Sequence, residues 1–128
     1  MKALFILYVK DQDESTRFYT TVLDRQPTLH VPGMTEFTLL DGCKLGLMPS
    51  KGIKRLLPEM PDPAQADGVP RSEVYLIVPD AAGFHRRALE AGAIELSGLT
   101  ERAWGDMVAY SMDRDGHVLA FAEPAEPV

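Results

Sequence analysis

Apolar and polar positions in the first half of the chain predict one strand, one helix and three further strands. The apolar run at residues 4–9 predicts a buried strand. Residues 13–23 predict a helix, because apolar residues recur there at helical spacing, and Pro27 stops it. Three short strands are then expected around residues 28–31, 36–40 and 44–48, with turns at Pro32-Gly33 and Asp41-Gly42.

The second half predicts the same order of elements. A strand at residues 73–78 precedes a helix at 81–91, which Gly92 closes. Further strands are expected at residues 93–96, 107–112 and 118–122, the last two joined by the turn Asp115-Gly116. The chain is therefore a duplicated strand, helix, strand, strand, strand unit.

The connection between the halves differs in character from both. Residues 49–70 contain five prolines and two glycines, which argues against a long regular element, although a short helical turn is possible near 53–57. We expect modules at residues 1–49 and 73–123, joined by a Pro-rich linker at 50–72, within one domain of residues 1–128. Connections of this length are usually functional or mobile, so we expect the linker to cover something.

Composition narrows the possible partners and the compartment. The net charge of -6 argues against binding to nucleic acid or to an anionic membrane, which needs clustered Lys and Arg. The single cysteine, Cys43, fits a reducing compartment. No apolar run is long enough to span a bilayer, and the N-terminus lacks the features of a signal peptide. We therefore expect a cytoplasmic protein.

Two motifs add a family resemblance to this duplicated order. Residues 9–23 end in Phe18-Tyr19-Thr20-Thr21-Val22-Leu23, and residues 113–121 contain Asp113-Arg114-Asp115-Gly116. Together they resemble the vicinal oxygen chelate superfamily, the group of glyoxalase I, bleomycin and fosfomycin resistance proteins and extradiol dioxygenases. The resemblance implies an α+β fold of two βαβββ modules whose curled, mixed sheets surround a cavity. It also implies that modules pair within a chain or between chains, and exposed strand edges favour a homodimer.

Enzymes of this superfamily hold a divalent metal on the first and last strands of each module. By resemblance, the inherited positions are Leu4, Gly46, Glu73 and Ala120, and superposing the two Asp-Gly turns sets the register of Gly46. Of these four, only Glu73 has a side-chain donor, whereas a divalent site needs about three protein ligands. We therefore expect no metal and no other cofactor.

Glu73 begins an otherwise apolar strand, where a buried carboxylate is unfavourable unless it is paired. It is a polar first residue of the strand, a cavity carboxylate that binds a ligand, or a metal ligand completed by residues elsewhere. If it faces the cavity, the period of two along strands sends Tyr75, Ile77, Leu4, Ile6 and Tyr8 the same way. Trp104 precedes a strand and is a core residue or overhangs the cavity. The expected ligand-binding residues are Glu73, Tyr75, Tyr8, Ile6, Trp104 and Met48.

No catalytic residue can be named from the sequence. The three histidines form no metal-binding pattern. His85, beside two arginines, is expected to be solvated, and His117 is expected at a strand edge. A proton-transfer role for His30 has no carboxylate or nucleophile in a motif-like relation to support it. Neither a nucleophile triad nor a phosphate-binding loop is present in the sequence.

The sequence is compatible with three functions. The leading hypothesis is metal-free binding of a small, partly aromatic or cationic molecule, as in drug-sequestering bleomycin resistance proteins. The second is an enzyme of the same fold, such as a lyase, isomerase or dioxygenase-like protein. It would use metal ligands outside the inherited positions or Glu73 as a general base. The third is a dimeric interaction module with a vestigial cavity.

Overall fold

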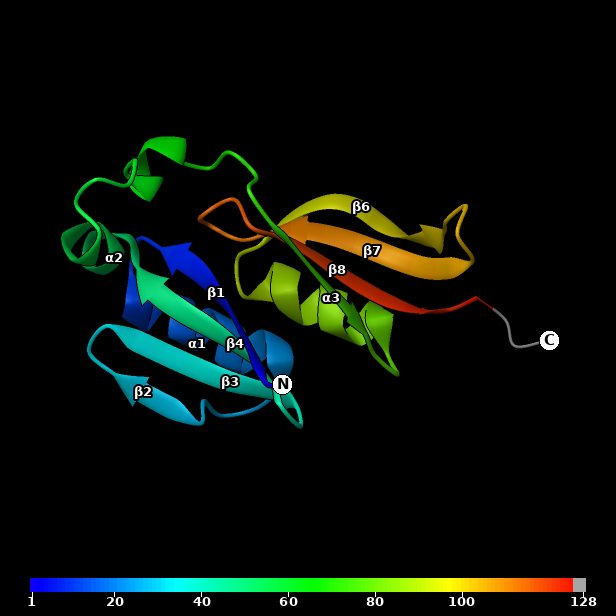
Figure 1. Cartoon of the computed structure of the whole chain (residues 1–128). Helices are drawn as coiled ribbons and strands as arrows, with labels where there is room; N and C mark the ends of the chain where they lie inside the picture. The colour runs from blue at the N-terminus through cyan, green and yellow to red at the C-terminus, as the bar shows by residue number, and fades with distance from the viewer. Residues whose placement is uncertain (126–128) are drawn as a thin grey trace. The chain divides into compact units, whose positions relative to one another are not determined.

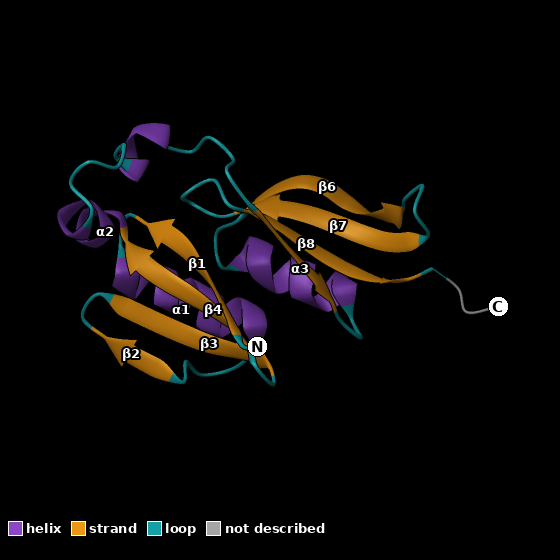
Figure 2. Cartoon of the chain, viewed as in Figure 1, coloured by secondary structure: helices purple, strands orange, loops and turns teal. Residues whose placement is uncertain are grey.

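The chain folds into two compact units, each built around one four-stranded sheet. The structure is a computed structural model that describes residues 1–125. Unit 1 comprises Met1–Asp67, and unit 2 begins at Gly68. Figures 1 and 2 show that each unit has a helix packed along one face of its sheet. The two units are α+β structures of the same design.

Unit 1 contains the first set of predicted elements. Its sheet has the strand order β1-β4-β3-β2, in which β1 is parallel to β4 and the other pairs are antiparallel. A short helix and one 3-10 turn follow the sheet in sequence. The bounds are β1 Ala3–Val9, α1 Gln12–Leu23, β2 Leu29–Val31, β3 Met34–Leu40, β4 Cys43–Pro49, α2 Ser50–Leu56 and η1 Pro63–Ala66.

Unit 2 repeats this connectivity. Its strand order is β5-β8-β7-β6, again with the first and last strands of the module parallel and adjacent. The duplicated order predicted from the sequence is confirmed. The bounds are β5 Glu73–Ile77, α3 Ala81–Glu90, β6 Ile94–Glu101, β7 Asp106–Met112 and β8 Val118–Pro124.

Both long helices begin at an aspartate that caps them. The carboxylate of Asp11 accepts a hydrogen bond from the backbone N–H of Glu14, and that of Asp80 accepts one from Gly83. Each bond satisfies a donor that the first turn of a helix leaves unpaired. Helix α1 ends at Leu23, and its C-cap residue Asp24 has a left-handed φ of 53°, so the helix stops before Pro27.

The core of each unit lies between its sheet and its helix. In unit 1, Phe37, Leu45 and Leu47 are fully buried on the side of the sheet that α1 covers. In unit 2, Phe121 packs against Phe84 of α3, with ring centroids 5.5 Å apart. Because strand side chains alternate between the two faces, those on one face of each sheet pack under the helix. We call the opposite side the open face.

Two histidine predictions are wrong. His85 is only 7% exposed, and its Nε2 lies 2.9 Å from a carboxylate oxygen of Glu95. The neighbouring arginines suggested a solvated position, but Ala81, His85 and Ala88 share the buried face of α3. His117 is 3% exposed, with Nδ1 2.7 Å from the hydroxyl of Ser72. It leads into β8, which is an inner strand rather than an edge.

Some boundaries also differ from the prediction. The segment expected as a Pro-rich linker carries α2, which extends the possible turn near residues 53–57 back to Ser50. Strand β6 continues to Glu101, beyond the predicted end at residue 96, because β7 supplies pairing partners across two register irregularities. None of the helices within residues 1–125 combines the length and apolar character needed to cross a bilayer.

The close approach of two backbones at Gly116 yields a stability prediction. Gly116 has φ +90°, and a Cβ built there lies 2.7 Å from the carbonyl carbon of Gly68, whereas Gly105 has φ +97° with open space around its Cβ. Both Gly→Ala changes introduce left-handed strain of about 1–2 kcal/mol. Gly116→Ala adds the backbone clash, so in urea denaturation it should lower the free energy of unfolding by at least ~1 kcal/mol more than Gly105→Ala does. Equal effects would show that the approach is not required.

Candidate functional site

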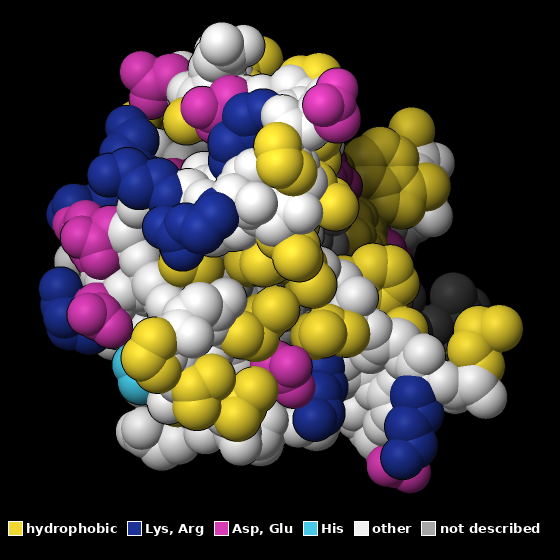
Figure 3. Space-filling model, turned by 60° about the vertical axis from the view of Figure 1, so that its left-hand side comes forward, with side chains coloured by type: hydrophobic (Ala, Val, Ile, Leu, Met, Phe, Trp, Pro, Cys, Tyr) yellow, Lys and Arg dark blue, Asp and Glu magenta, His cyan; other side chains and the backbone are white. Residues whose placement is uncertain are grey.

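The open face of unit 1 is apolar and crowded around Gly46. Gly46 is paired with Ile6 on the neighbouring strand. A Cβ added at Gly46 would lie 3.2 Å from side-chain atoms of both Leu4 and Ile6, and 3.3 Å from the sulfur of Met34. The space that a larger residue would use is therefore already filled by neighbouring apolar side chains. Figure 3 shows hydrophobic side chains gathered on one side of the molecule. The large apolar residues exposed on β1 and β2 are Leu4, Ile6, Leu29 and Val31.

One charged pair crosses this apolar surface. Glu36 is paired with Gly46 in the sheet, and its carboxylate lies 3.3 Å from Nζ of Lys44. The Glu36 side chain is only 16% exposed, so Lys44 compensates a carboxylate that is largely removed from water. The sequence reasoning missed this pair. Strand alternation could have found it, because Glu36 lies between the buried residues Thr35 and Phe37.

The open face of unit 2 is built from two tyrosines on a floor of small residues. The rings of Tyr75 and Tyr110 pack against the buried cluster of Val108, Ala120 and Ala122. Tyr75 is paired with Ala120 across β5 and β8. Because the alanine side chains are short, the aromatic rings can lie over this part of the sheet. The result is an aromatic surface on this side of the sheet.

A hydrogen-bonded chain fixes one edge of this aromatic surface. The hydroxyl of Tyr75 donates to Oδ2 of Asp106 at 2.5 Å, and Nε1 of Trp104 donates to the Tyr75 oxygen at 2.9 Å. The Trp104 residue is nevertheless 59% exposed. The indole is thus held by its nitrogen while its ring remains accessible. We call Tyr75, Asp106 and Trp104 the phenol cluster.

Arg102 supports the same surface from the β6 side. Its guanidinium carbon lies 5.0 Å from the ring centroid of Tyr110. The same guanidinium donates to the hydroxyl of Ser97 at 2.8 Å and to the backbone carbonyl of Val108 at 2.9 Å. These bonds join the β6–β7 connection to both strands that flank it, because Ser97 lies in β6 and Val108 lies in β7. Neither Arg102 nor Asp106 was singled out by the sequence reasoning, because only the folded loop brings them to the tyrosines.

The environment of Tyr75 favours its neutral phenol. Desolvation raises the pKa of Tyr75 above its usual value of 10.0, and the hydrogen bond to Asp106 raises it further. The hydrogen bond from Trp104 acts in the opposite direction but does not reverse the shift. Tyr75 therefore remains a hydrogen-bond donor to Asp106 throughout the neutral range. Its oxygen, already accepting from Trp104, keeps a second lone pair for another donor.

The inherited metal positions do not fit a divalent cation. Leu4, Gly46 and Ala120 have no donor atom, and Ala120 is fully buried beneath the tyrosines. Glu73, the remaining position, is exposed at the start of β5. Within residues 1–125, no three His, Cys, Asp or Glu side chains come together in a way that could hold a metal ion. The donor chemistry therefore gives no route for a reaction step through a metal at these positions.

The six predicted ligand-binding residues fall on both units. Ile6, Tyr8 and Met48 belong to β1 and β4 of unit 1, where Tyr8 and Met48 are paired neighbours. Glu73, Tyr75 and Trp104 belong to unit 2, and of these the hydrogen bond brings Tyr75 and Trp104 together. Since residues at alternate positions share a face, Glu73 lies on the same face of β5 as Tyr75.

These features first define a class, a duplicated βαβββ fold with one helix-covered face and one open face in each unit. The model of the Glyoxalase/Bleomycin resistance protein/Dioxygenase superfamily matches residues 3–121, and the chain belongs to that superfamily. The resemblance inferred from the sequence is therefore confirmed. A search of curated proteins finds no match.

Several solved structures share the fold at low sequence identity. A glyoxalase-related enzyme from Fulvimarina pelagi is 20% identical with a TM-score of 0.82, covering 96% of this chain and 87% of that one. A glyoxalase/bleomycin resistance protein/dioxygenase from Nocardioides is 19% identical with a TM-score of 0.78, covering 100% and 85%. A glyoxalase/bleomycin resistance protein from Catenulispora acidiphila is 22% identical with a TM-score of 0.63, covering 96% and 97%. At these identities the likeness concerns the fold alone.

The raised pKa of Tyr75 gives a pH prediction. Because its folded pKa exceeds the unfolded value, its contribution to stability is present below about pH 10 and is lost as pH rises toward the folded pKa. Asp106→Asn removes a cause of the shift, so Tyr75 should titrate at lower pH in that variant. Tyrosinate absorbance, with the Tyr75→Phe titration subtracted, measures this.

The control is Asp41→Asn, which makes the same charge change in the exposed turn of unit 1. It should leave the Tyr75 titration unchanged. A titration of Tyr75 that is identical in wild type and Asp106→Asn would contradict the role assigned to the Asp106 carboxylate.

Proposed function

We propose that this protein binds a small, partly aromatic or cationic molecule without a metal ion, and sequesters it rather than converting it. One observation carries the proposal: three of the four inherited metal positions, Leu4, Gly46 and Ala120, have no donor atom. The space at two of them is filled by apolar or aromatic neighbours. A site that has exchanged ligands for apolar surface is suited to binding rather than to metal chemistry.

Burial of apolar ligand surface would provide most of the affinity. The open face of unit 2 offers the rings of Tyr75 and Tyr110 together with the accessible indole of Trp104. Burial of about 200 Å² of apolar surface at ~25 cal/mol/Å² contributes roughly 5 kcal/mol before the cost of association. Such a surface favours a planar or aromatic ligand.

The phenol cluster would fix the orientation of that ligand. The Tyr75 oxygen has an acceptor position left, and Asp106 brings a negative charge to the same edge. Both favour a ligand that carries an N–H or O–H donor, or a positive charge. Glu73 extends this preference along the same face of β5. The net charge of -6 acts in the same direction over longer distances.

Homodimerisation is part of the proposal. In both units one face of the sheet is left without a covering helix, and exposed apolar residues lie on it. Edge strands such as β2 and β6 also leave backbone groups available for pairing. A second copy of the chain is the simplest partner for such surfaces. Sedimentation equilibrium of the full chain should give twice the monomer mass.

An enzyme of this fold is the second candidate. The observation that favours it is the hydrogen bond between Tyr75 and Asp106, since a neutral phenol in a site can serve as a general acid. Glu73 is the weaker candidate for a general base, because it lies exposed to solvent at the start of β5. In either version, turnover would be unaffected by a chelator but reduced by Tyr75→Phe or Glu73→Gln.

Trp104 makes the binding hypothesis directly measurable. It is the only tryptophan in the chain, so fluorescence excited selectively at tryptophan reports the phenol cluster. We expect saturable quenching by at least one member of a panel of aromatic cations containing berberine, ethidium and bleomycin, and the same affinity in excess EDTA. Tyr75→Ala should weaken that binding at least about 10-fold, or ~1.4 kcal/mol, through loss of the ring and its oxygen.

The matched control is Phe5→Ala. Phe5 is also an exposed aromatic residue on the first strand of a module, but its position along β1 places it on the side opposite to Leu4 and Ile6. It should leave the fluorescence titration unchanged. Turnover that disappears on chelation and returns with a divalent ion would overturn the proposal, as would equal weakening by both variants.

A further inference from the structure

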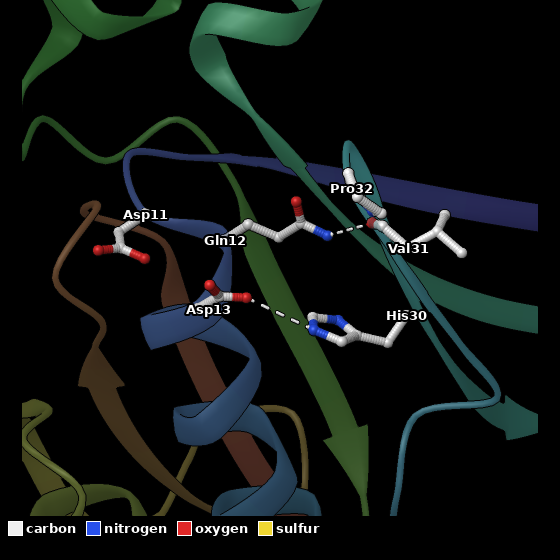
Figure 4. A pocket seen from close by; sticks show the side chains of 6 residues that line it. All are labelled: Asp11, Gln12, Asp13, His30, Val31 and Pro32. Carbon is white, nitrogen blue, oxygen red and sulfur yellow. Dashed lines mark hydrogen bonds and ion pairs between the residues drawn. The ribbon is translucent and has the colours of Figure 1, made fainter.

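A separate cavity of about 280 Å³ lies at the start of α1, beside the hairpin of β2 and β3. It is lined by Asp11, Gln12, Asp13, His30, Val31 and Pro32. Figure 4 shows His30 and Asp13 pointing toward each other across it, with Gln12 reaching the hairpin above them. Of these residues only Val31 also contributes to the open face of unit 1, so the cavity is a second candidate site within that unit.

The orientation of the Gln12 amide is fixed by the backbone on both sides. Its Oε1 accepts from the backbone N–H of Gly33 at 2.9 Å, and its Nε2 donates to the carbonyl of Val31 at 2.8 Å. A flipped amide would place donor against donor and acceptor against acceptor. Nε2 is therefore the atom that also donates to Oγ1 of Thr35 at 3.0 Å.

The hydrogen bonds of Thr16 and Thr35 determine which nitrogen of His30 carries hydrogen. Thr16 uses its hydroxyl proton on the carbonyl of Gln12, at 2.8 Å, and so accepts from Thr35 at 3.0 Å. Thr35, which is fully buried, has then used its only proton, yet Nδ1 of His30 lies 2.8 Å from its oxygen. The contact is a hydrogen bond only if Nδ1 of His30 is the donor.

With Nδ1 protonated, neutral His30 turns a lone pair on Nε2 toward Asp13. Nε2 and the Asp13 carboxylate oxygen lie 3.5 Å apart. Both are acceptors, so neutral His30 and ionised Asp13 face each other without a hydrogen between them. Asp11 is the other ionisable group lining the cavity, and one of its oxygens already accepts from the backbone of Glu14. The hairpin side contributes no further acid or base to the lining.

We propose that this cavity binds the protonated primary amine of a small molecule. An alkylammonium group supplies three N–H donors and one positive charge, and so can donate to both Nε2 of His30 and the Asp13 carboxylate. Two carboxylates disfavour an anion there. Because the side chains of His30 and Asp13 are 44% and 75% exposed, ligands can enter and affinity will be modest.

A proton competes with the amine for the same position. When His30 is protonated, its Nε2–H donates to Asp13 and its charge repels an ammonium group. A proton and an amine should therefore exclude each other at Nε2 of His30.

The test is a titration of the full chain with n-propylammonium, followed by ¹⁵N–¹H correlation spectra of the histidine rings. Free His30 should carry hydrogen on Nδ1, and added amine should shift its Nε2 resonance saturably. Tetramethylammonium, which has the charge but no N–H donor, should give no saturable shift.

Matched substitutions at the two ends of α1 complete the experiment. Asp13→Asn should weaken propylammonium binding at least about 5-fold, whereas Asp24→Asn, which removes the same charge at the C-cap, should not change it. The proposal is overturned by a neutral His30 with hydrogen on Nε2, by equal binding of tetramethylammonium, or by equal effects of the two variants. Trp104 fluorescence should stay constant throughout, which separates this site from the phenol cluster.

Discussion

The parallel pairing of the first and last strands of each module is the constraint on which the rest of the structure depends. Since β1 and β4 run in the same direction, the chain must cross over between them, and helix α1 with the β2–β3 hairpin makes that connection. The helix covers one face only. The register of the parallel pair then decides which residues share the other face, placing Ile6 beside Gly46 in unit 1 and Tyr75 beside Ala120 in unit 2.

The small residues at those paired positions are covered by different side chains in the two units. At Gly46 the neighbouring Leu4, Ile6 and Met34 close over the vacant space, which leaves a compact apolar surface. At Ala120 the tyrosine rings lie over the sheet and bring hydroxyl groups with them. At both positions the residue present has no donor atom, and neighbouring side chains occupy the space above it. Restoring a single carboxylate at Gly46 would meet three side chains already in contact distance.

Strand and helix order, and the faces of β1 and β5, could be predicted from the sequence because they depend on local periodicity. Alternation alone predicts that Ile6 shares a face of β1 with Leu4 and that Tyr75 shares a face of β5 with Glu73. The remainder depends on tertiary contacts. Arg102 meets Tyr110 only through the loop before β7, and His85 is buried because a carboxylate of β6 lies opposite it. The hydrogen bonds of Gln12 likewise depend on a hairpin that begins many residues later.

Both candidate sites carry more hydrogen-bond acceptors than donors, and this surplus determines the ligands that suit them. In the phenol cluster, Tyr75 has given its only proton to Asp106 and retains a lone pair. In the α1 cavity, the proton of Thr35 is directed into the core, so His30 must turn its own acceptor outward toward Asp13. A net charge of -6 adds an attraction for cations that neither geometry alone provides. An anionic ligand would oppose all three effects, whereas a donor or cation satisfies each of them, so charge and hydrogen-bond accounting select the same ligand chemistry at two unrelated positions.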